Sequence, residues 1–564
     1  MKPALGQLPT GIRRLLGSRR LPGGPRLSGG RFRIGDAASK LLAIVIASFL
    51  FAASFPNSFF AEGLPFFAWI AFIPVFWVVR RASFASSFFW GALYGYSAYG
   101  LYNYWLSVFH PLAGLIVGSI YLTYFTILFP LLKLADRLFP RRGYLVQWLL
   151  WMAYEYLRTK GFLGYAYGIS GYSQWNVLPL IQIAAIFGVW GVSALVVFPS
   201  VYLAAALRDG FSGIRGFLRA EWVPAAIWAA AILAAVAYGF LSPVDYSDAP
   251  TRRIALIQSN TDPWRGGIEV YRENFQTLKR LSEEALVQEK KPDLVVWSET
   301  AFVPRIHWHS TYRDDPESYA LVRELLDFLS TTDVPFVIGN DDGRKEVSEA
   351  GVWERVDYNA VLLYQAGEER GIYRKLHLVP FTEHFPYEKQ LPLIHQALKN
   401  ADTHFWKKGT EATVFEAAGV RFSTPICFED TFGYLSRRFV SSGAELIINL
   451  TNDAWASSLP CQMQHATMAV FRAVENRRSV VRATASGQTC AIDPNGRVIA
   501  MAEPFAELQL SVDVPVYTET STPYTAYGDF LAQFFVIAAA LSLMAGICVA
   551  IFRGVSARPQ VKRT

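Results

Sequence analysis

The sequence predicts an integral membrane protein in which a multi-pass helical region with eight spans carries one α/β domain on its non-cytoplasmic side. Of its 564 residues, 52% are hydrophobic and only 18% are charged, against roughly 25% charged in an average soluble protein. Apolar runs of spanning length cluster before residue 245 and recur once near the end. The polar stretch between them alternates short β-branched runs with helical patterns, which is typical of a layered sheet architecture.

Eight apolar runs are candidate membrane spans, because a spanning helix needs about 20 largely apolar residues. The first two runs are the shortest. The runs lie at 41–56, 65–79, 84–109, 112–135, 144–160, 178–206, 222–242 and 529–552. They divide the chain into a basic tail (1–40), seven spans (41–245), the α/β domain (246–526), an eighth span (527–553) and a second basic tail (554–564).

The positive charge of the chain lies at its two ends. The net charge is +7, but residues 1–40 hold nine basic side chains against one acidic one, and four more basic residues follow 552. Between 41 and 552 there remain 40 basic and 45 acidic residues. The pI near 9.0 therefore does not describe a basic nucleic-acid-binding body, and no nucleic-acid partner is expected.

Basic residues in the short connections predict the orientation, since they favour the cytoplasmic side. With the N-terminal tail inside, the second, fourth and sixth connections are also inside. These connections carry Arg80, Arg81, Arg137, Arg141, Arg142, Arg208, Arg215 and Arg219. Only the fifth connection, with Arg158 and Lys160, opposes the trend. Both termini are thus expected in the cytoplasm and the α/β domain on the other side.

The α/β domain is predicted from apolar, β-branched segments separated by helical patterns. Strands are expected at 253–258, 293–299, 335–340, 359–365, 420–429 and 445–453. Helices are expected at 268–288, 317–330, 431–442 and 461–484.

The four cysteines, 427, 461, 490 and 548, have no metal-site spacing and are too sparse for a disulfide framework. The His307–His309 triplet could suggest a metal pair, but no Cys or carboxylate cluster completes it, so we expect a surface loop and no metal.

Glu155 lies in the fifth run, where an ionisable residue is costly. Pairing with Arg158 is favoured over substrate contact.

Cys427 is the cysteine whose surroundings suggest chemistry. It closes a predicted strand and precedes a predicted helix. The positive end of a helix lowers a thiol pKa and favours the reactive thiolate. The alternative is a small buried hydrophobic residue, which most free cysteines are.

Two further charged residues could complete a site for acyl transfer. Glu299 ends the strand DLVVWSE, and carboxyl ends of strands are where α/β sheets place their sites. Lys375 is flanked by apolar residues and followed eight positions later by Glu383. A helix cap and a solvated strand-end charge are the alternatives. Together Cys, Glu and Lys supply a nucleophile, a base and an electrostatic stabiliser.

These residues lie in segments that resemble a known family. WSETAFVP (297–304), YRKLHLVPFTEHFP (373–386) and PICFED (425–430) resemble the three catalytic blocks of the nitrilase, or carbon–nitrogen hydrolase, superfamily. Seven spans before that domain and one after it are similar to the apolipoprotein N-acyltransferase family, as are YEYLR (154–158), GYSQ (171–174), NDAW (452–455) and HATMAVFRAVENRR (465–478). The resemblance implies a nitrilase-like αββα sandwich.

The resemblance also implies residue roles. Glu299 is the general base, Lys375 stabilises the oxyanion and Cys427 is the nucleophile. Glu383 is a supporting carboxylate, and Glu429 matches a second functional acidic position. Phe428 stands where many members have Tyr, and Trp264 roughly matches a Trp that contacts substrate.

The implied activity is transfer of the sn-1 acyl chain of a membrane phospholipid to the α-amine of an S-diacylglyceryl-cysteine at the N-terminus of an apolipoprotein, through a Cys thioester. No cofactor or metal is needed, a monomer suffices, and the implied location is the bacterial inner membrane with a periplasmic catalytic domain. One alternative is a membrane-tethered nitrilase-type amidase acting on a small amide. Another is a transporter or receptor whose outer domain only binds.

Overall fold

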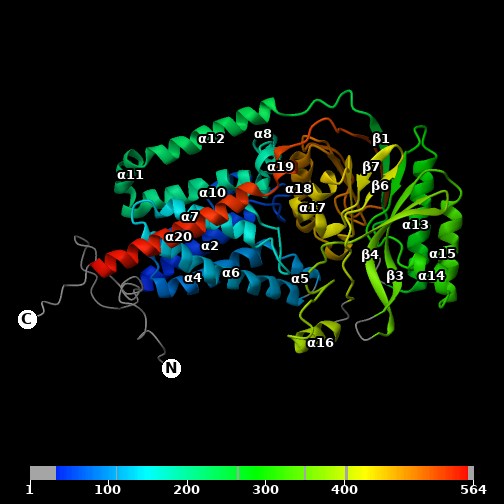
Figure 1. Ribbon diagram of the computed structural model, residues 1–564, viewed down its shortest axis with the longest axis horizontal. Helices are drawn as coiled ribbons and strands as arrows, with labels where there is room; N and C mark the ends of the chain where they lie inside the picture. The colour runs from blue at the N-terminus through cyan, green and yellow to red at the C-terminus, as the bar shows by residue number, and fades with distance from the viewer. Residues whose placement is uncertain (1–33, 110, 263–265, 348–350, 401–403, 557–564) are drawn as a thin grey trace, which may run out of the picture.

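The chain forms two parts that lie end to end along its long axis (Figure 1). The computed structural model describes residues 34–556 except 110, 263–265, 348–350 and 401–403. A bundle of long helices occupies one end, and an α/β domain with two sheets occupies the other. Trp264 and most of the two basic tails lie outside the described residues.

The helical part, here called the membrane half, contains a helix at the position of every predicted span. Its main helices are α2 (Ile34–Ala53), α3 (Ile73–Arg81), α4 (Phe84–Tyr102), α6 (Pro111–Leu138), α7 (Gly143–Leu157), α10 (Val189–Ala206), α12 (Trp222–Leu241) and α20 (Phe530–Ser556). Shorter elements connect them: η2 (Pro65–Trp69), α5 (Leu106–Phe109), η3 (Ser170–Gln174), α8 (Leu178–Ile181), α9 (Ala184–Phe187), η4 (Leu207–Asp209), η5 (Phe211–Gly213) and α11 (Ile214–Ala220).

Five of these helices, α2, α6, α10, α12 and α20, are long and apolar enough to cross a membrane. The second predicted span is divided between η2 and the nine-residue α3, and α7 has 15 residues. The membrane half therefore has several apolar helices of spanning length, and the count of eight spans stays a prediction.

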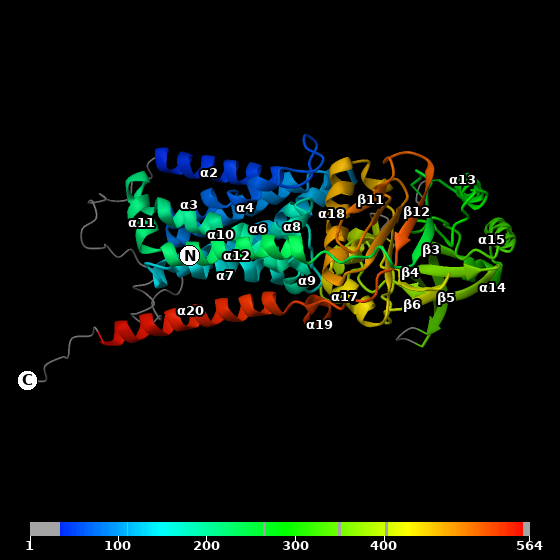
Figure 2. The same ribbon diagram turned by 90° about the horizontal axis from the view of Figure 1, so that it is seen from above.

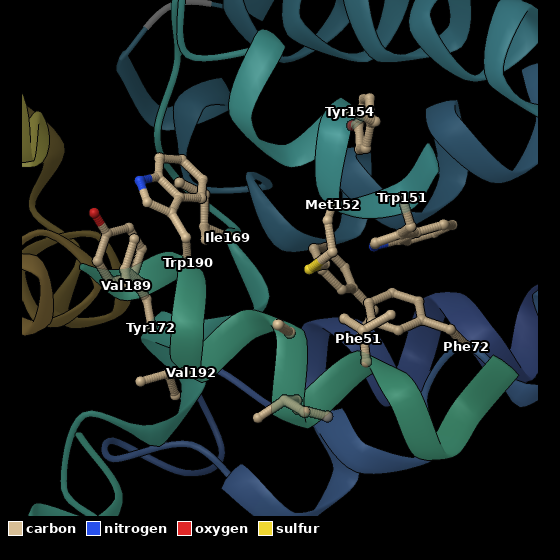
Figure 3. Packing of buried hydrophobic residues seen from close by; sticks show 14 of the residues in the cluster. Phe51, Phe72, Trp151, Met152, Tyr154, Ile169, Tyr172, Val189, Trp190 and Val192 are labelled. Atoms are coloured by element: carbon tan, nitrogen blue, oxygen red, sulfur yellow. The ribbon is translucent and has the colours of Figure 1, made fainter. Parts of the chain in front are cut away.

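Close packing in the membrane half depends on small residues and aromatic rings. A Cβ atom on Gly91 or Gly95 of α4 would lie 2.1 or 2.3 Å from a carbonyl oxygen of α6, so only glycine allows this approach. Aromatic rings also pack together in this half: the Phe72 ring lies between those of Phe51 and Trp151, with centroid distances of 6.0 and 4.5 Å (Figure 3).

Two six-stranded sheets form the centre of the α/β domain. The outer sheet has the order β12 (Leu508–Pro515), β1 (Thr251–Gln258), β2 (Leu294–Val296), β3 (Phe336–Val347), β4 (Trp353–Gln365) and β5 (Glu368–Arg374). The inner sheet has the order β11 (Val498–Met501), β10 (Cys490–Ile492), β9 (Ser479–Thr484), β8 (Leu446–Thr451), β7 (Val420–Ser423) and β6 (Val414–Ala417).

Helices cover both sheets and complete an αββα sandwich, as the resemblance implied. Side chains such as Leu256, Val296 and Ile448 fill the space between the sheets. The outer sheet packs against α13 (Ile268–Leu286) and α15 (Pro316–Leu329), and α17 (Gly433–Ser441) and α18 (Leu459–Asn476) lie between the inner sheet and the membrane half (Figure 2). Shorter helices are α14 (Ile306–Tyr312), α16 (Pro392–Asn400), η6 (Cys427–Thr431), η7 (Ala454–Ala456) and α19 (Pro523–Tyr527).

Two local predictions are wrong. The helix expected at 461–484 ends at Asn476, because Arg477 adopts a left-handed conformation with φ 50° and the chain then enters β9. The His307–His309 triplet is part of α14 and not of a surface loop. No cluster of three metal-ligating side chains is found among the described residues.

Candidate active site

Glu299, Lys375 and Glu383 form a connected group of charges at the ends of outer-sheet strands. Glu299 follows β2 and Lys375 directly follows β5. The Lys375 Nζ lies 3.2 Å from Glu299 Oε1 and 2.8 Å from Glu383 Oε1. The Lys375 side chain is fully buried and its two partners are nearly so. The sequence-predicted base and stabiliser are therefore in direct contact.

The charge on Lys375 is maintained by its two carboxylate partners. Burial alone would lower its pKa, but Glu299 and Glu383 outweigh burial and raise the pKa above its usual value. An ammonium group has three donors, and the two carboxylates occupy two of them in the described structure. The third is free to bind a developing oxyanion.

Two asparagines missed by the sequence interpretation position Glu299. The Asn359 amide of β4 donates to Glu299 Oε1 (2.8 Å), and the Asn452 backbone N–H, after β8, donates to Oε2 (3.1 Å). The signal for Asn359 is a polar residue at the buried start of the apolar strand NAVLLYQ. Asn452 belongs to the NDAW segment, but its contact is made by the backbone, which sequence alone does not reveal.

Cys427 begins η6 immediately beyond the inner-sheet segment that ends with Ile426, in a left-handed conformation with φ 48°. Such backbone strain in a non-glycine residue is typical of functional turns. Burial, and then the negative charge of Glu299, raise the pKa of the Cys427 thiol well above its usual range, while Lys375 opposes the shift. The Asn449 amide of β8 donates to the Cys427 carbonyl (3.3 Å), and the Asn452 N–H just after β8 donates to Glu299. Cys427 therefore belongs to the same site as Glu299 and Lys375.

The expected lowering of the Cys427 pKa is therefore wrong. The element after Cys427 is a five-residue 3₁₀ turn, and the α-helix starts only at Gly433. A short turn provides little helix dipole, so burial and the nearby carboxylate dominate. The resting group is a thiol, which needs a base to become a nucleophile.

Glu429 lies behind this turn and connects it to the Lys375 segment. Its carboxylate accepts hydrogen bonds from the Tyr373 hydroxyl (2.7 Å) and from the backbone N–H groups of Leu376, His377 and Ile426 (2.7–2.9 Å). Burial raises its pKa to about 7 although these donors oppose the shift. With its oxygens occupied, Glu429 fixes the positions of the turn and the Lys375 segment and is not available as a base.

The candidate site faces the membrane half. Cys427, Leu376 and Val379 pack against the apolar cluster that also fills the membrane half. The buried Phe428 ring stacks near Tyr165, with 6.2 Å between centroids. Phe162, which like Tyr165 lies between α7 and η3, has its ring centroid 5.2 Å from that of Phe381. Apolar side chains from both parts of the chain thus surround the nucleophile.

Glu155 and Arg158 were predicted to pair with each other, but in the structure each forms hydrogen bonds with other partners. Glu155 is buried in α7 and accepts hydrogen bonds from the Ser170 N–H and hydroxyl (3.2 and 2.5 Å). Arg158 donates to the Tyr121 hydroxyl (2.6 Å) and to the carbonyls of Tyr165 and Tyr167 (3.0 and 2.8 Å). Trp264, the expected substrate-contacting residue, lies outside the described residues.

Comparisons with known proteins match both parts of the chain. A carbon–nitrogen hydrolase model matches residues 253–524, and a model of the apolipoprotein N-acyltransferase N-terminal domain matches residues 47–202. The chain is 47% identical over 539 residues to apolipoprotein N-acyltransferase 1 of Treponema denticola, which covers 93% of this chain and 98% of that protein. It is 47% identical over 529 residues to apolipoprotein N-acyltransferase 1 of Treponema pallidum (92% and 96%).

A more distant relative shows the same full-length match. The chain is 32% identical over 521 residues to the apolipoprotein N-acyltransferase of Geobacter metallireducens, covering 89% of this chain and 94% of that protein. The match therefore includes both the membrane half and the α/β domain, and this chain belongs to the apolipoprotein N-acyltransferase family.

Proposed function

We propose that this acyltransferase moves the sn-1 acyl chain of a membrane phospholipid to the N-terminal α-amine of an S-diacylglyceryl-cysteine in apolipoproteins, through a thioester on Cys427. The observation that carries the proposal is the packing of Cys427 against the apolar cluster of the membrane half, next to Glu299 and Lys375. A nucleophile in that position can meet a lipid ester. The two Treponema relatives, both named apolipoprotein N-acyltransferase 1 and matched over nearly their whole length, favour lipoprotein acylation over amide hydrolysis.

In the first half-reaction, Glu299 takes the thiol proton and the Cys427 sulfur attacks the ester carbonyl. Lys375 stabilises the oxyanion of the tetrahedral intermediate. The C–O bond to glycerol then breaks, Glu299 returns the proton to the departing oxygen, and lysophospholipid leaves. The acyl chain remains on Cys427 as a thioester.

In the second half-reaction, the α-amine of the diacylated apolipoprotein attacks the thioester carbonyl. Glu299 takes a proton from the amine, an amide bond forms, the C–S bond breaks and the proton returns to Cys427. Glu383 holds Lys375, Glu429 holds the turn, and Phe428 and Trp264 contact the substrate. Exclusion of water from the apolar surroundings limits hydrolysis of the thioester.

The reaction also suggests an arrangement in the cell. Eight spans would place the α/β domain on the periplasmic face of the bacterial inner membrane, with both basic termini in the cytoplasm. Both substrates are anchored in the outer leaflet of that membrane, so a monomer can reach them. Neither step requires a metal or a cofactor.

The test is transfer in vitro from a phospholipid with a labelled sn-1 chain to a synthetic diacylated lipopeptide. Wild-type protein is expected to form triacylated lipopeptide, and mass spectrometry of protein incubated with phospholipid alone should find one acyl group on Cys427. Cys427→Ala should lose both signals. Turnover of a soluble amide without any acylation of Cys427 by phospholipid would instead establish the tethered amidase.

A further inference from the structure

A buried cluster of four charged side chains lies directly behind the nucleophile, and the reaction described above does not use it. His465 of α18 is its centre. The His465 Nε2 lies 2.9 Å from Asp430 Oδ1, and its Nδ1 lies 3.1 Å from Asp453 Oδ1. Arg482 of β9 contacts both aspartates. All four side chains are at most 2% exposed.

The cluster touches the nucleophile through the backbone. The His465 Nε2 is also 3.3 Å from the carbonyl oxygen of Cys427, which accepts a second hydrogen bond from the Asn449 amide at 3.3 Å. Asp430 lies in η6, three residues after Cys427. The left-handed conformation of Cys427 therefore depends on partners in α18 and β8.

The same imidazole also reaches the segment that holds the base. Asp453 follows Asn452, whose N–H donates to Glu299 Oε2 at 3.1 Å. Asp453 is itself in a left-handed conformation, with φ 49°. Two strained turns, one carrying the nucleophile and the other binding the base, thus meet on opposite nitrogens of one ring.

We propose that His465 is a positioning residue for acyl transfer, whose doubly protonated ring joins the Cys427 turn to the Asn452–Asp453 turn and so sets the distance between nucleophile and base. The inference rests on the proposed function of Cys427 and Glu299. His465 does not contact substrate. It acts by holding two backbone segments whose conformations are unfavourable on their own.

The protonation state follows from the groups that face the ring. These are Asp430, Asp453, Arg482, the backbone carbonyl of Cys427 and, from the membrane half, Tyr167 at 6.0 Å between ring centroids. Burial alone would lower the His465 pKa, but the two aspartates raise it to about 9. At neutral pH both nitrogens are therefore donors, and two carboxylates are balanced by two cations.

The experiment compares His465→Gln with wild type in single-turnover acylation of Cys427 by labelled phospholipid between pH 6 and 10. Glutamine can donate to one aspartate but cannot join both. We expect acylation about 100-fold slower at pH 7, since misplacement of reacting groups by about 1 Å costs on that order. We also expect the wild-type rate to fall as the pH rises through about 9, and this alkaline decline to be absent in His465→Gln.

Thr467→Val is the matched control, because it removes a buried hydrogen bond to Gln464 from the same helix and leaves the cluster intact. Equal slowing in both variants, or a wild-type pH profile in His465→Gln, would overturn the proposal. Alkylation of Cys427 by iodoacetamide, followed by peptide mapping, separates this result from the proposed function. If wild type transfers no acyl chain, the proposed function fails. The role of His465 is then tested by the alkylation rate of Cys427 alone: a changed rate in His465→Gln relative to wild type supports it, and an equal rate contradicts it.

Discussion

The two helical layers of the α/β domain differ in what covers them. In the outer layer, α13 buries six of its 19 residues against the sheet and exposes charged side chains on its other face. In the inner layer, every residue of α18 from Pro460 to Asn476 is buried, including Arg472 and Glu475. Helix α13 of the outer layer is an ordinary amphipathic helix, whereas α18 of the inner layer is buried on both faces because the membrane half lies against it.

Polar contacts hold that inner surface together. Arg472 pairs with Glu475 at 2.9 Å and donates to the Thr431 carbonyl at the end of the nucleophile turn (3.0 Å). From the membrane half, the Val189 N–H donates to Glu475 (3.1 Å), and Tyr172 donates to Thr431 (3.3 Å). Figure 3 shows Tyr172 and Val189 at the side of the membrane half that faces the domain. The inner layer therefore connects the site to the membrane half, and the outer layer does not.

The largest effect is expected at the site that the inner layer supports. Glu299→Gln removes the base while its size and its neighbours stay the same, so acylation of Cys427 should fall by about 10²–10⁴-fold. The measurement is single-turnover acylation at pH 7, with the melting temperature as a control for folding. Substantial acylation in this variant would mean that another group deprotonates the thiol.

The next effect tests the connection between the two parts. Arg472→Met leaves Glu475 buried without its cation, and breaking a buried pair costs about 3–5 kcal/mol. We expect a melting temperature lower by on the order of 10 °C and slower acylation. A fall in the melting temperature with unchanged acylation would show that the Thr431 contact does not support the nucleophile turn.

A smaller loss of stability is expected when the pH is raised, because His465 of α18 in the inner layer loses its proton. The His465 pKa is raised to about 9 from 6.5, so its stabilising contribution is complete below about pH 6.5 and disappears as the pH rises through about 9. The expected loss is on the order of 1–3 kcal/mol, seen as a falling melting temperature over this range. The decrease of the melting temperature with rising pH should be smaller in His465→Gln. An unchanged decrease would assign the titration to another group.

The smallest effect is expected in the outer layer. Arg280 of α13 contacts Glu284 and Glu507, but its side chain is 50% exposed, and such surface pairs contribute about 0–1 kcal/mol. Arg280→Met, the counterpart of Arg472→Met, should leave acylation unchanged and shift the melting temperature by no more than a few degrees. Loss of activity here would mean that the outer layer also supports the site.

The residues that could be predicted from sequence are those whose surroundings are local. Glu299 and Cys427 each follow an apolar strand, and Lys375 is flanked by apolar residues, and these local patterns indicated the site. The strands β5, β6, β11 and β12 were missed, because they are short or only half-buried and lack a clear apolar run.

Features that depend on distant partners could not be predicted. Helix α18 ends without glycine or proline at Arg477, whose side chain binds Gln182 of the membrane half (2.6 Å) and Asn495 (3.0 Å). The raised pKa of the Cys427 thiol depends on burial in the folded chain and on Glu299, 128 positions away along the chain. His465 likewise meets Asp430 only in the folded chain.

The complete burial of α18 has a consequence for how the chain is made. Residues 34–241 precede the α/β domain, so the surface that α18 needs is synthesised before α18 itself, and chains fold largely in the order in which they emerge. The last helix then closes the junction, because Asp529, just before α20, binds Trp190 (2.8 Å) and Lys160 (3.3 Å). The α/β domain produced alone would expose the apolar side chains of α18 that pack against the membrane half, such as Met468 and Phe471, and is expected to aggregate.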